Sequence, residues 1–123
     1  MKARRWGRIV NTCSLAAKTG GLTAGTAYSV SKGALSALTF SLARELASCG
    51  VTANAVAPAY VRTPTVTEQL SEEQRQALMK QIPVGRFCEP EEFARVARFP
   101  ASPLSGFITG EIIDLNGGLL MDR

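Results

Sequence analysis

Residues 28–58 read YSVSKGALSALTFSLARELASCGVTANAVAP, and this stretch decides the fold. Four leucines recur at helical spacing and predict a helix over residues 28–48; they are Leu35, Leu38, Leu42 and Leu46. Gly50 ends this helix, since glycine is common just past a helix terminus. Residues 51–57, which are mostly apolar, predict a short strand that Pro58 closes.

The segments on either side of this pair continue the alternation. Residues 8–13 predict a short buried strand, and the glycines and threonines of residues 18–26 predict a loop. After a long loop over residues 58–70, Ser71 and Gln74 fit a capping box that opens a helix to about Gln81.

The last third of the chain predicts one more helix and one more strand. Proline and acidic residues at Glu89-Pro90-Glu-Glu open a helix, and Pro100 should end it because proline clashes with the carbonyl four residues back. We expect a loop over residues 101–105, a strand over residues 111–115, and a turn at Asn116-Gly-Gly.

The predicted order is therefore β-α-β-α-α-β. Helices between short apolar strands are typical of right-handed crossovers in a parallel sheet. The fold class is α/β, a partial doubly wound, Rossmann-like parallel sheet corresponding to the C-terminal half of such a fold.

The helix over residues 28–48 is apolar nearly all round, which is typical of a helix buried on two faces. The leucine face would lie on the sheet. The other face carries small or aromatic residues that suit close packing against a partner: Ala34, Ala37, Phe40, Ala43 and Ala47. We therefore expect a homo-oligomer assembled through this helix.

Composition limits the class of protein. A chain of 123 residues suits one domain, and 46% hydrophobic with 20% charged residues is typical of soluble globular proteins. No apolar run approaches the ~18 residues that span a bilayer, and no apolar stretch follows the basic N-terminus, so we expect a cytoplasmic protein without membrane contact. Three scattered cysteines and no histidine argue against a disulfide framework, a zinc site or a histidine triad.

Four basic residues lie within the first eight positions: Lys2, Arg4, Arg5 and Arg8. They fit either a nucleic-acid or phosphate patch, or a solvated chain end near a helix terminus whose dipole favours cations. No nucleic-acid motif accompanies them, so we expect no nucleic-acid partner.

Four segments in order resemble the C-terminal portion of the short-chain dehydrogenase/reductase family. They are Gly7-Arg-Ile-Val-Asn-Thr-Cys-Ser14, Tyr28-Ser-Val-Ser-Lys32-Gly-Ala, Asn54-Ala-Val-Ala-Pro58-Ala-Tyr-Val-Arg-Thr63, and residues 106–118. Within the family, the chain is most similar to 3-oxoacyl-carrier-protein reductases and to sugar or alcohol dehydrogenases. The resemblance covers about residues 6–122. It implies an NAD- or NADP-dependent oxidoreductase that moves a hydride between nicotinamide and a small-molecule carbonyl or secondary alcohol.

The resemblance assigns catalytic roles to three residues. Tyr28 would exchange a proton with the substrate oxygen, Lys32 would also hold the nicotinamide ribose, and Ser14 would hydrogen-bond the substrate. Tyr28 and Lys32 lie one helical turn apart, and a nearby ammonium makes a phenol a better proton donor. The alternatives are an ordinary amphipathic tyrosine, a solvated lysine, and a strand-end serine that satisfies backbone.

The segment after the second strand resembles the family's cofactor-binding segment. By that resemblance the segment of Pro58 and Ala59 lies against the cofactor, while the Val61 backbone and the Thr63 hydroxyl contact the nicotinamide carboxamide. Ala59 stands where the family usually has glycine, and its methyl group would crowd the cofactor or force the backbone to adjust. The alternative is a proline-punctuated surface loop. Residues 65–83 would cover the active site, and their mixed character indicates no single substrate.

The glycine-rich turn that receives the pyrophosphate in this family does not occur in the sequence. The whole chain, residues 1–123, is thus expected to be one partial domain that lacks the dinucleotide-binding half. The first strand of this chain would then expose an edge. Three interpretations stay open: an active oxidoreductase, a truncated non-catalytic fragment, or half of a split enzyme completed by another chain.

Overall fold

Three parallel strands form the centre of the molecule in a computed structural model, which describes residues 1–121. They are β1 (Gly7–Thr12), β2 (Val51–Pro58) and β3 (Ile112–Leu115), in the spatial order β1-β2-β3. Gly7 pairs with Val51, and Ala55 pairs with Ile112. The α/β class and the parallel sheet are confirmed, and β1 lies at an edge.

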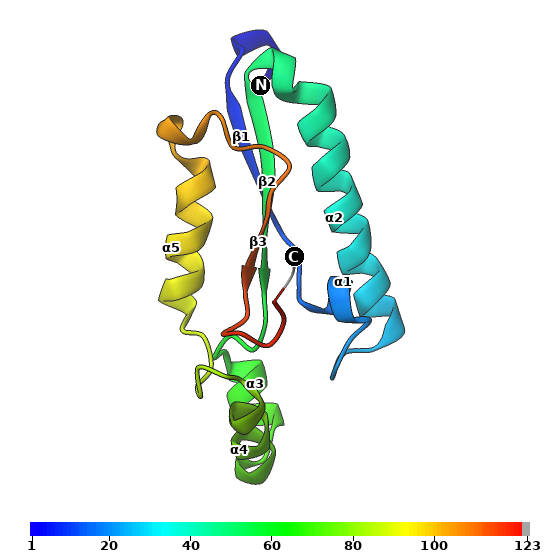
Figure 1. Cartoon of the computed structure of the whole chain (residues 1–123), viewed down its shortest axis with the longest axis vertical. Coiled ribbons are helices and arrows are strands. Elements are labelled where there is room, and N and C mark those ends of the chain that lie inside the picture. Colours follow the sequence, from blue (N-terminus) through cyan, green and yellow to red (C-terminus); the bar gives the residue numbers. More distant parts are fainter. Residues whose placement is uncertain (122–123) are drawn as a thin grey trace.

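Two helices cover opposite faces of this sheet, as Figure 1 shows: α2 (Thr26–Leu46) on one side and α5 (Pro90–Ala101) on the other. All but the last residue of β2 are buried because this strand has neighbours on both edges and both faces. The helix predicted over residues 28–48 begins two residues earlier and ends in a short turn, η2 (Ala47–Cys49). Gly50 follows with a φ of 74°, which explains why glycine ends the helix.

Side chains of β2 connect the sheet to both layers. On the α2 side, Ala55 and Ala57 form a small core with Cys13, against which Leu35 and Ile112 pack. On the α5 side, fully buried Asn54 donates its amide to the Ile108 carbonyl at 3.0 Å and accepts the Glu111 N–H at 3.0 Å. Asn54 thereby fixes the path of the chain into β3.

The prediction that Pro100 ends the last helix is wrong by a short margin. α5 contains Pro100 and ends at Ala101, and the expected loop contains a turn, η3 (Pro103–Ser105). A proline in the last turn removes only one backbone donor, and the Ser102 N–H still bonds the Phe99 carbonyl at 3.2 Å. The Pro100 ring is almost fully buried, so its packing offsets the lost hydrogen bond.

Each of the two predicted loops overlaps a short helix, the first of which begins at Ala16, two residues before its predicted loop. α1 (Ala16–Thr19) follows β1, and α3 (Pro64–Gln69) begins with a proline, which is pre-organised for the first helical position. Both are too short to show a helical period in the sequence. α4 (Glu72–Gln81) has the predicted capping box, in which Ser71 and Gln74 exchange hydrogen bonds of 2.8 and 3.1 Å.

The basic N-terminus forms a short turn, η1 (Lys2–Arg4), and two of its arginines bond carbonyls at helix ends. Arg5 donates to the Ser48 carbonyl at 2.8 Å, and Arg8 donates to the Ser102 carbonyl at 3.0 Å. These positions follow α2 and α5, where the helix dipole favours cations. Within residues 1–121, no helix combines the length and the apolar character that crossing a bilayer requires.

Candidate active site

A cavity of about 490 Å³ lies at the carboxyl end of β1 and β2, the edge at which such folds bind ligands. Four predicted site residues line it: Ser14, Tyr28, Pro58 and Ala59. Its remaining walls come from α1 and the loop after it, from α3, and from one residue of α4. The fold thus brings residues from two strand ends and one helix start to a common space.

Ser14 reaches this cavity because β1 ends just before it. The Cys13 N–H still bonds the Val56 carbonyl at 2.8 Å, and the chain then turns into α1. Ser14 is a buried residue, only 8% exposed, and its hydroxyl accepts a hydrogen bond from the Ala16 N–H at 3.1 Å. A hydroxyl that accepts one bond keeps its own proton, so Ser14 can still donate to a ligand oxygen.

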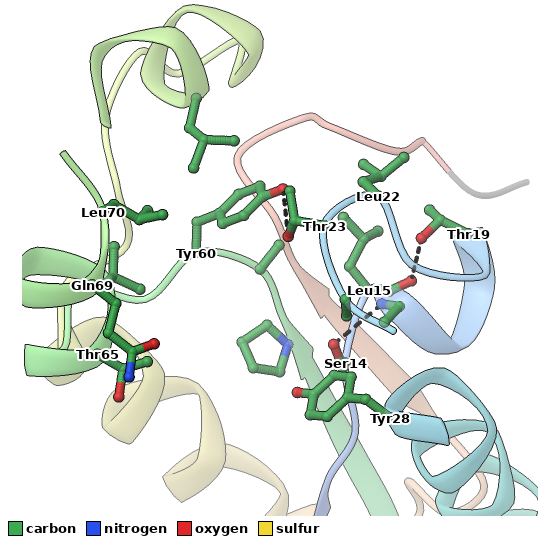
Figure 2. Close-up of a pocket in the computed structure, with 16 residues that line it drawn as sticks. Ser14, Leu15, Thr19, Leu22, Thr23, Tyr28, Tyr60, Thr65, Gln69 and Leu70 are labelled. Atoms are coloured by element: carbon green, nitrogen blue, oxygen red, sulfur yellow. Dashed lines mark hydrogen bonds between the residues drawn. The ribbon is translucent and has the colours of Figure 1, made fainter. Parts of the chain in front are cut away.

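Tyr28 lies in the first turn of α2, where the residue is 47% exposed and its side chain lies beside Ser14 (Figure 2). One turn later, the Lys32 ammonium lies 5.6 Å from the centre of the Tyr28 ring and donates to the Thr12 carbonyl at 2.9 Å. Because an ammonium has three donors, this bond holds Lys32 in place and leaves two hydrogens for other partners. Lys32 itself does not line the cavity.

The segment after β2 bends at Tyr60. The Ala59 N–H bonds the Leu115 carbonyl at 3.0 Å, so this residue extends the β2–β3 pairing. Tyr60 has a φ of 53°, and Arg5 is the other non-glycine residue with a positive φ in the described chain. The left-handed position in this segment is therefore at Tyr60, and Ala59 has no positive φ.

Val61 and Thr63 lie next to the cavity without lining it. Val61 pairs with Cys88 in an isolated bridge whose bonds use the Tyr60 carbonyl and the Arg62 N–H, at 3.0 and 2.7 Å. This pattern leaves the Val61 N–H and carbonyl unbonded within residues 1–121. Thr63 precedes α3, and its hydroxyl makes no capping bond. Both residues thus retain the polar groups that a ligand could use.

Two ion pairs hold the start of α5, one from Arg62 in this segment and one from Arg86 in the loop between α4 and α5. Arg62 bonds Glu89 through two nitrogens, with Nε at 2.9 Å from Oε1, and Arg86 bonds Glu92 at 2.7 and 2.8 Å. Hydrogen bonds from Arg86, then from the Glu89 N–H, lower the pKa of Glu92 to about 2. The hydrogen bond to Arg62 likewise lowers the pKa of Glu89, and burial raises the pKa of the Cys88 thiol.

Tyr60 and Thr23 are among the cavity residues that sequence reasoning missed. Their hydroxyls lie 3.4 Å apart, although they are 37 positions apart in the chain. Tyr60 lies within the quoted segment of residues 54–63 but has no role assigned to it there, Thr23 belongs to no motif, and no local pattern signals a contact between two loops. Among residues 1–121, no group of three or more histidine, cysteine or acidic side chains could hold a metal ion.

Comparisons with known proteins show which proteins the chain is similar to. The model of the family described as Enoyl-(Acyl carrier protein) reductase matches residues 1–120. A 3-oxoacyl-(acyl-carrier-protein) reductase of Aquifex aeolicus is 48% identical over 119 residues, covering 97% of this chain and 47% of the relative. One of Vibrio cholerae is 43% identical over 122 residues, covering 98% and 49%.

A solved structure agrees with this sequence similarity. The crystal structure of 3-oxoacyl-(acyl-carrier protein) reductase from Brucella melitensis superposes with a TM-score of 0.93 and is 37% identical. It covers 99% of this chain, whereas this chain covers 45% of it. The chain therefore spans about half the length of the relatives it matches.

Proposed function

Because the chain belongs to the short-chain dehydrogenase/reductase family, we propose that it carries the proton-transfer site of an NAD(P)-dependent oxidoreductase. The observation that carries this proposal is the arrangement of Ser14, Tyr28 and Lys32 near the carboxyl ends of the strands. The names of the relatives make a 3-oxoacyl thioester the substrate to test first.

Each residue has a defined task in the reduction direction. The free Ser14 hydrogen donates to the substrate carbonyl and orients it toward Tyr28. The Tyr28 hydroxyl gives its proton to the carbonyl oxygen as that oxygen becomes an alkoxide. The Lys32 ammonium lies near the Tyr28 ring and stabilises the negative charge that remains on the phenol.

A nicotinamide cofactor, when bound, would supply the hydride. The residues present fit its nicotinamide half, since Lys32 keeps two donors and the Val61 backbone keeps an unbonded N–H and carbonyl. The Thr63 hydroxyl adds a third free polar group, and Pro58 and Ala59 would form the surface beneath the ring. A glycine-rich turn for the pyrophosphate is not among the 123 residues. The tests below therefore ask whether a second chain must supply that turn.

The exposed face of α2 supports a homo-oligomer as part of this proposal. Val30, Leu38 and Phe40 are 65%, 46% and 49% exposed, while the opposite side of the helix buries Thr39, Ala43 and Leu46. The faces predicted for Leu38 and Ala43 are therefore wrong, since Leu38 is exposed and Ala43 is buried. Single apolar residues are common on surfaces, but three on one helix are expected to be covered. Sedimentation of the protein and of Phe40→Glu would test this interface.

The test of the proposed function combines binding with turnover. We expect NADPH or NADH fluorescence to change on titration, and acetoacetyl pantetheine to be reduced. Tyr28→Phe should lower turnover roughly 10²- to 10⁴-fold, the usual contribution of a positioned acid or base, with nucleotide binding and circular dichroism unchanged. Tyr60→Phe removes the other phenol of the chain and should lower turnover far less.

The outcomes separate this function from its alternatives. Full turnover by Tyr28→Phe would refute the role of Tyr28. A folded protein that binds neither nucleotide would favour the non-catalytic interpretation. Turnover that appears only when a second chain with a glycine-rich turn is added would favour a split enzyme, an arrangement for which the edge position of β1 leaves a pairing site among the described strands.

A further inference from the structure

Among residues 1–121, no charged side chain lines the cavity at the site, and aliphatic residues from three segments form much of its wall. Leu22 comes from the loop after α1, Val66 from α3, and Leu78 from α4. Such a wall favours an uncharged aliphatic group beside the reacting carbonyl. The residues that close the cavity would limit the size of that group.

Tyr60 is held firmly at one side of this space. Its φ of 53° directs the side chain away from the path of β2, and its carbonyl accepts the Cys88 N–H at 3.0 Å. Its ring lies 6.4 Å from the Phe87 ring, tilted by 53°, an arrangement favourable for aromatic pairs. Phe87 is buried, so it forms a fixed support for the Tyr60 ring.

Thr23 meets the Tyr60 hydroxyl from the opposite side, as Figure 2 shows, above Ser14 and Tyr28. The distance of 3.4 Å is long for two hydroxyls, which usually lie 2.5–3.0 Å apart, so the bond is weak. Thr23 lies in an exposed loop bounded by glycines, with Gly20 and Gly21 before it and Gly25 after it. The contact thus joins a fixed ring to a loop that can yield.

We propose that the Tyr60–Thr23 pair is a clasp that limits the length of the aliphatic chain of the substrate. A short chain fits beneath the closed clasp, whereas a longer chain must part the two hydroxyls and displace the loop. This inference rests on the proposed function for the identity of the carbonyl substrate. It assigns to Tyr60 and Thr23 a specificity role that is independent of proton transfer.

A merely structural role for the pair predicts a different result. A weak bond between solvent-exposed hydroxyls contributes little to stability. Its loss would then change affinity for all chain lengths alike, or not at all. Only a clasp makes the effect depend on ligand length, and this dependence is the quantity to measure.

The experiment measures binding of 3-hydroxybutyryl, 3-hydroxyoctanoyl and 3-hydroxydodecanoyl pantetheine by calorimetry. Thr23→Val and Tyr60→Phe each remove one hydroxyl and keep nearly the same shape. We expect each to raise the long-to-short affinity ratio about five-fold, and the double variant to add little more because one bond is lost in either case. Thr65→Val, which removes another cavity hydroxyl, should leave that ratio within about two-fold.

The results distinguish this inference from the proposed function. An unchanged ratio in both single variants, or no thioester binding by the unmodified protein, overturns the clasp. A changed ratio in a protein that reduces no 3-oxoacyl thioester keeps the clasp and removes the proposed reaction. Reduction by the unmodified protein together with unchanged ratios keeps the reaction and removes the clasp.

Discussion

The central sheet and the outer wall of the cavity, residues 64–81, are built on different principles. In β2 every residue from Val51 to Ala57 is buried, whereas α3 and α4 contain no buried residue. The outer wall is held mainly by polar contacts, such as the bond of 3.0 Å from Arg75 to the Thr67 carbonyl. The residues proposed for proton transfer thus lie next to the well-packed sheet. The aliphatic side chains of the outer wall lie on helices whose local unfolding requires little free energy.

The largest expected effect tests the sheet. Asn54→Ala would leave the Ile108 carbonyl and the Glu111 N–H without their partner. Loss of two bonds from a fully buried amide should lower the free energy of unfolding by about 2–3 kcal/mol. Thermal unfolding followed by circular dichroism should show a midpoint roughly 10 °C lower.

The matched control is Asn11→Ala in the edge strand. Its amide makes one bond of 3.0 Å, to the Thr39 hydroxyl, and the residue is only partly buried. We expect this variant to lose about 1 kcal/mol. If Asn54→Ala were no more destabilised than Asn11→Ala, burial would not be the source of the difference between the sheet and its surroundings.

A smaller effect is expected from Ser71→Ala in the outer wall. The variant removes the hydroxyl that accepts the Gln74 N–H at 3.1 Å, which should destabilise α4 by about 1 kcal/mol. Because α4 packs weakly, we expect faster hydrogen exchange of residues 72–81 with little change in the global unfolding midpoint. A fall in the midpoint as large as that of Asn54→Ala would show that the outer wall and the sheet unfold as one unit.

Sequence patterns predicted the sheet better than the wall. The leucine spacing of α2, Gly50 after it, and the apolar run of β2 are local signals that tertiary packing reinforces. The capping box of α4 is local too, and it was found. By contrast, α1 and α3 are single short helices whose residues show no period, and the last turn of α5 includes Pro100 because burial of its ring outweighs one lost bond.

The candidate site divides along the same line. Ser14, Tyr28 and Lys32 could be named because each occupies a fixed place in a motif on β1 or α2, although their roles stay predictions. Tyr60 and Thr23 could not be named, since their contact depends on a left-handed residue and on two loops distant in the chain. Local patterns find residues on regular elements, and contacts between loops need the structure.

The smallest expected effect concerns the junction where the wall meets α5. Hydrogen bonds lower the pKa of Glu92 from about 4.5 to about 2, so the ionised carboxylate stabilises the fold above its unfolded pKa. This contribution is lost as the pH falls through 4.5 toward 2. Glu92→Gln should therefore unfold at a lower temperature than the unmodified protein at neutral pH, and the two midpoints should converge near about pH 2. Glu91→Gln removes a charge from the same first turn without removing the Arg86 pair. The difference between its midpoint and that of the unmodified protein should therefore change less between neutral pH and about pH 2. A midpoint difference for Glu92→Gln that stayed constant from neutral pH to about pH 2 would mean that the Arg86–Glu92 pair does not stabilise the junction through its charge.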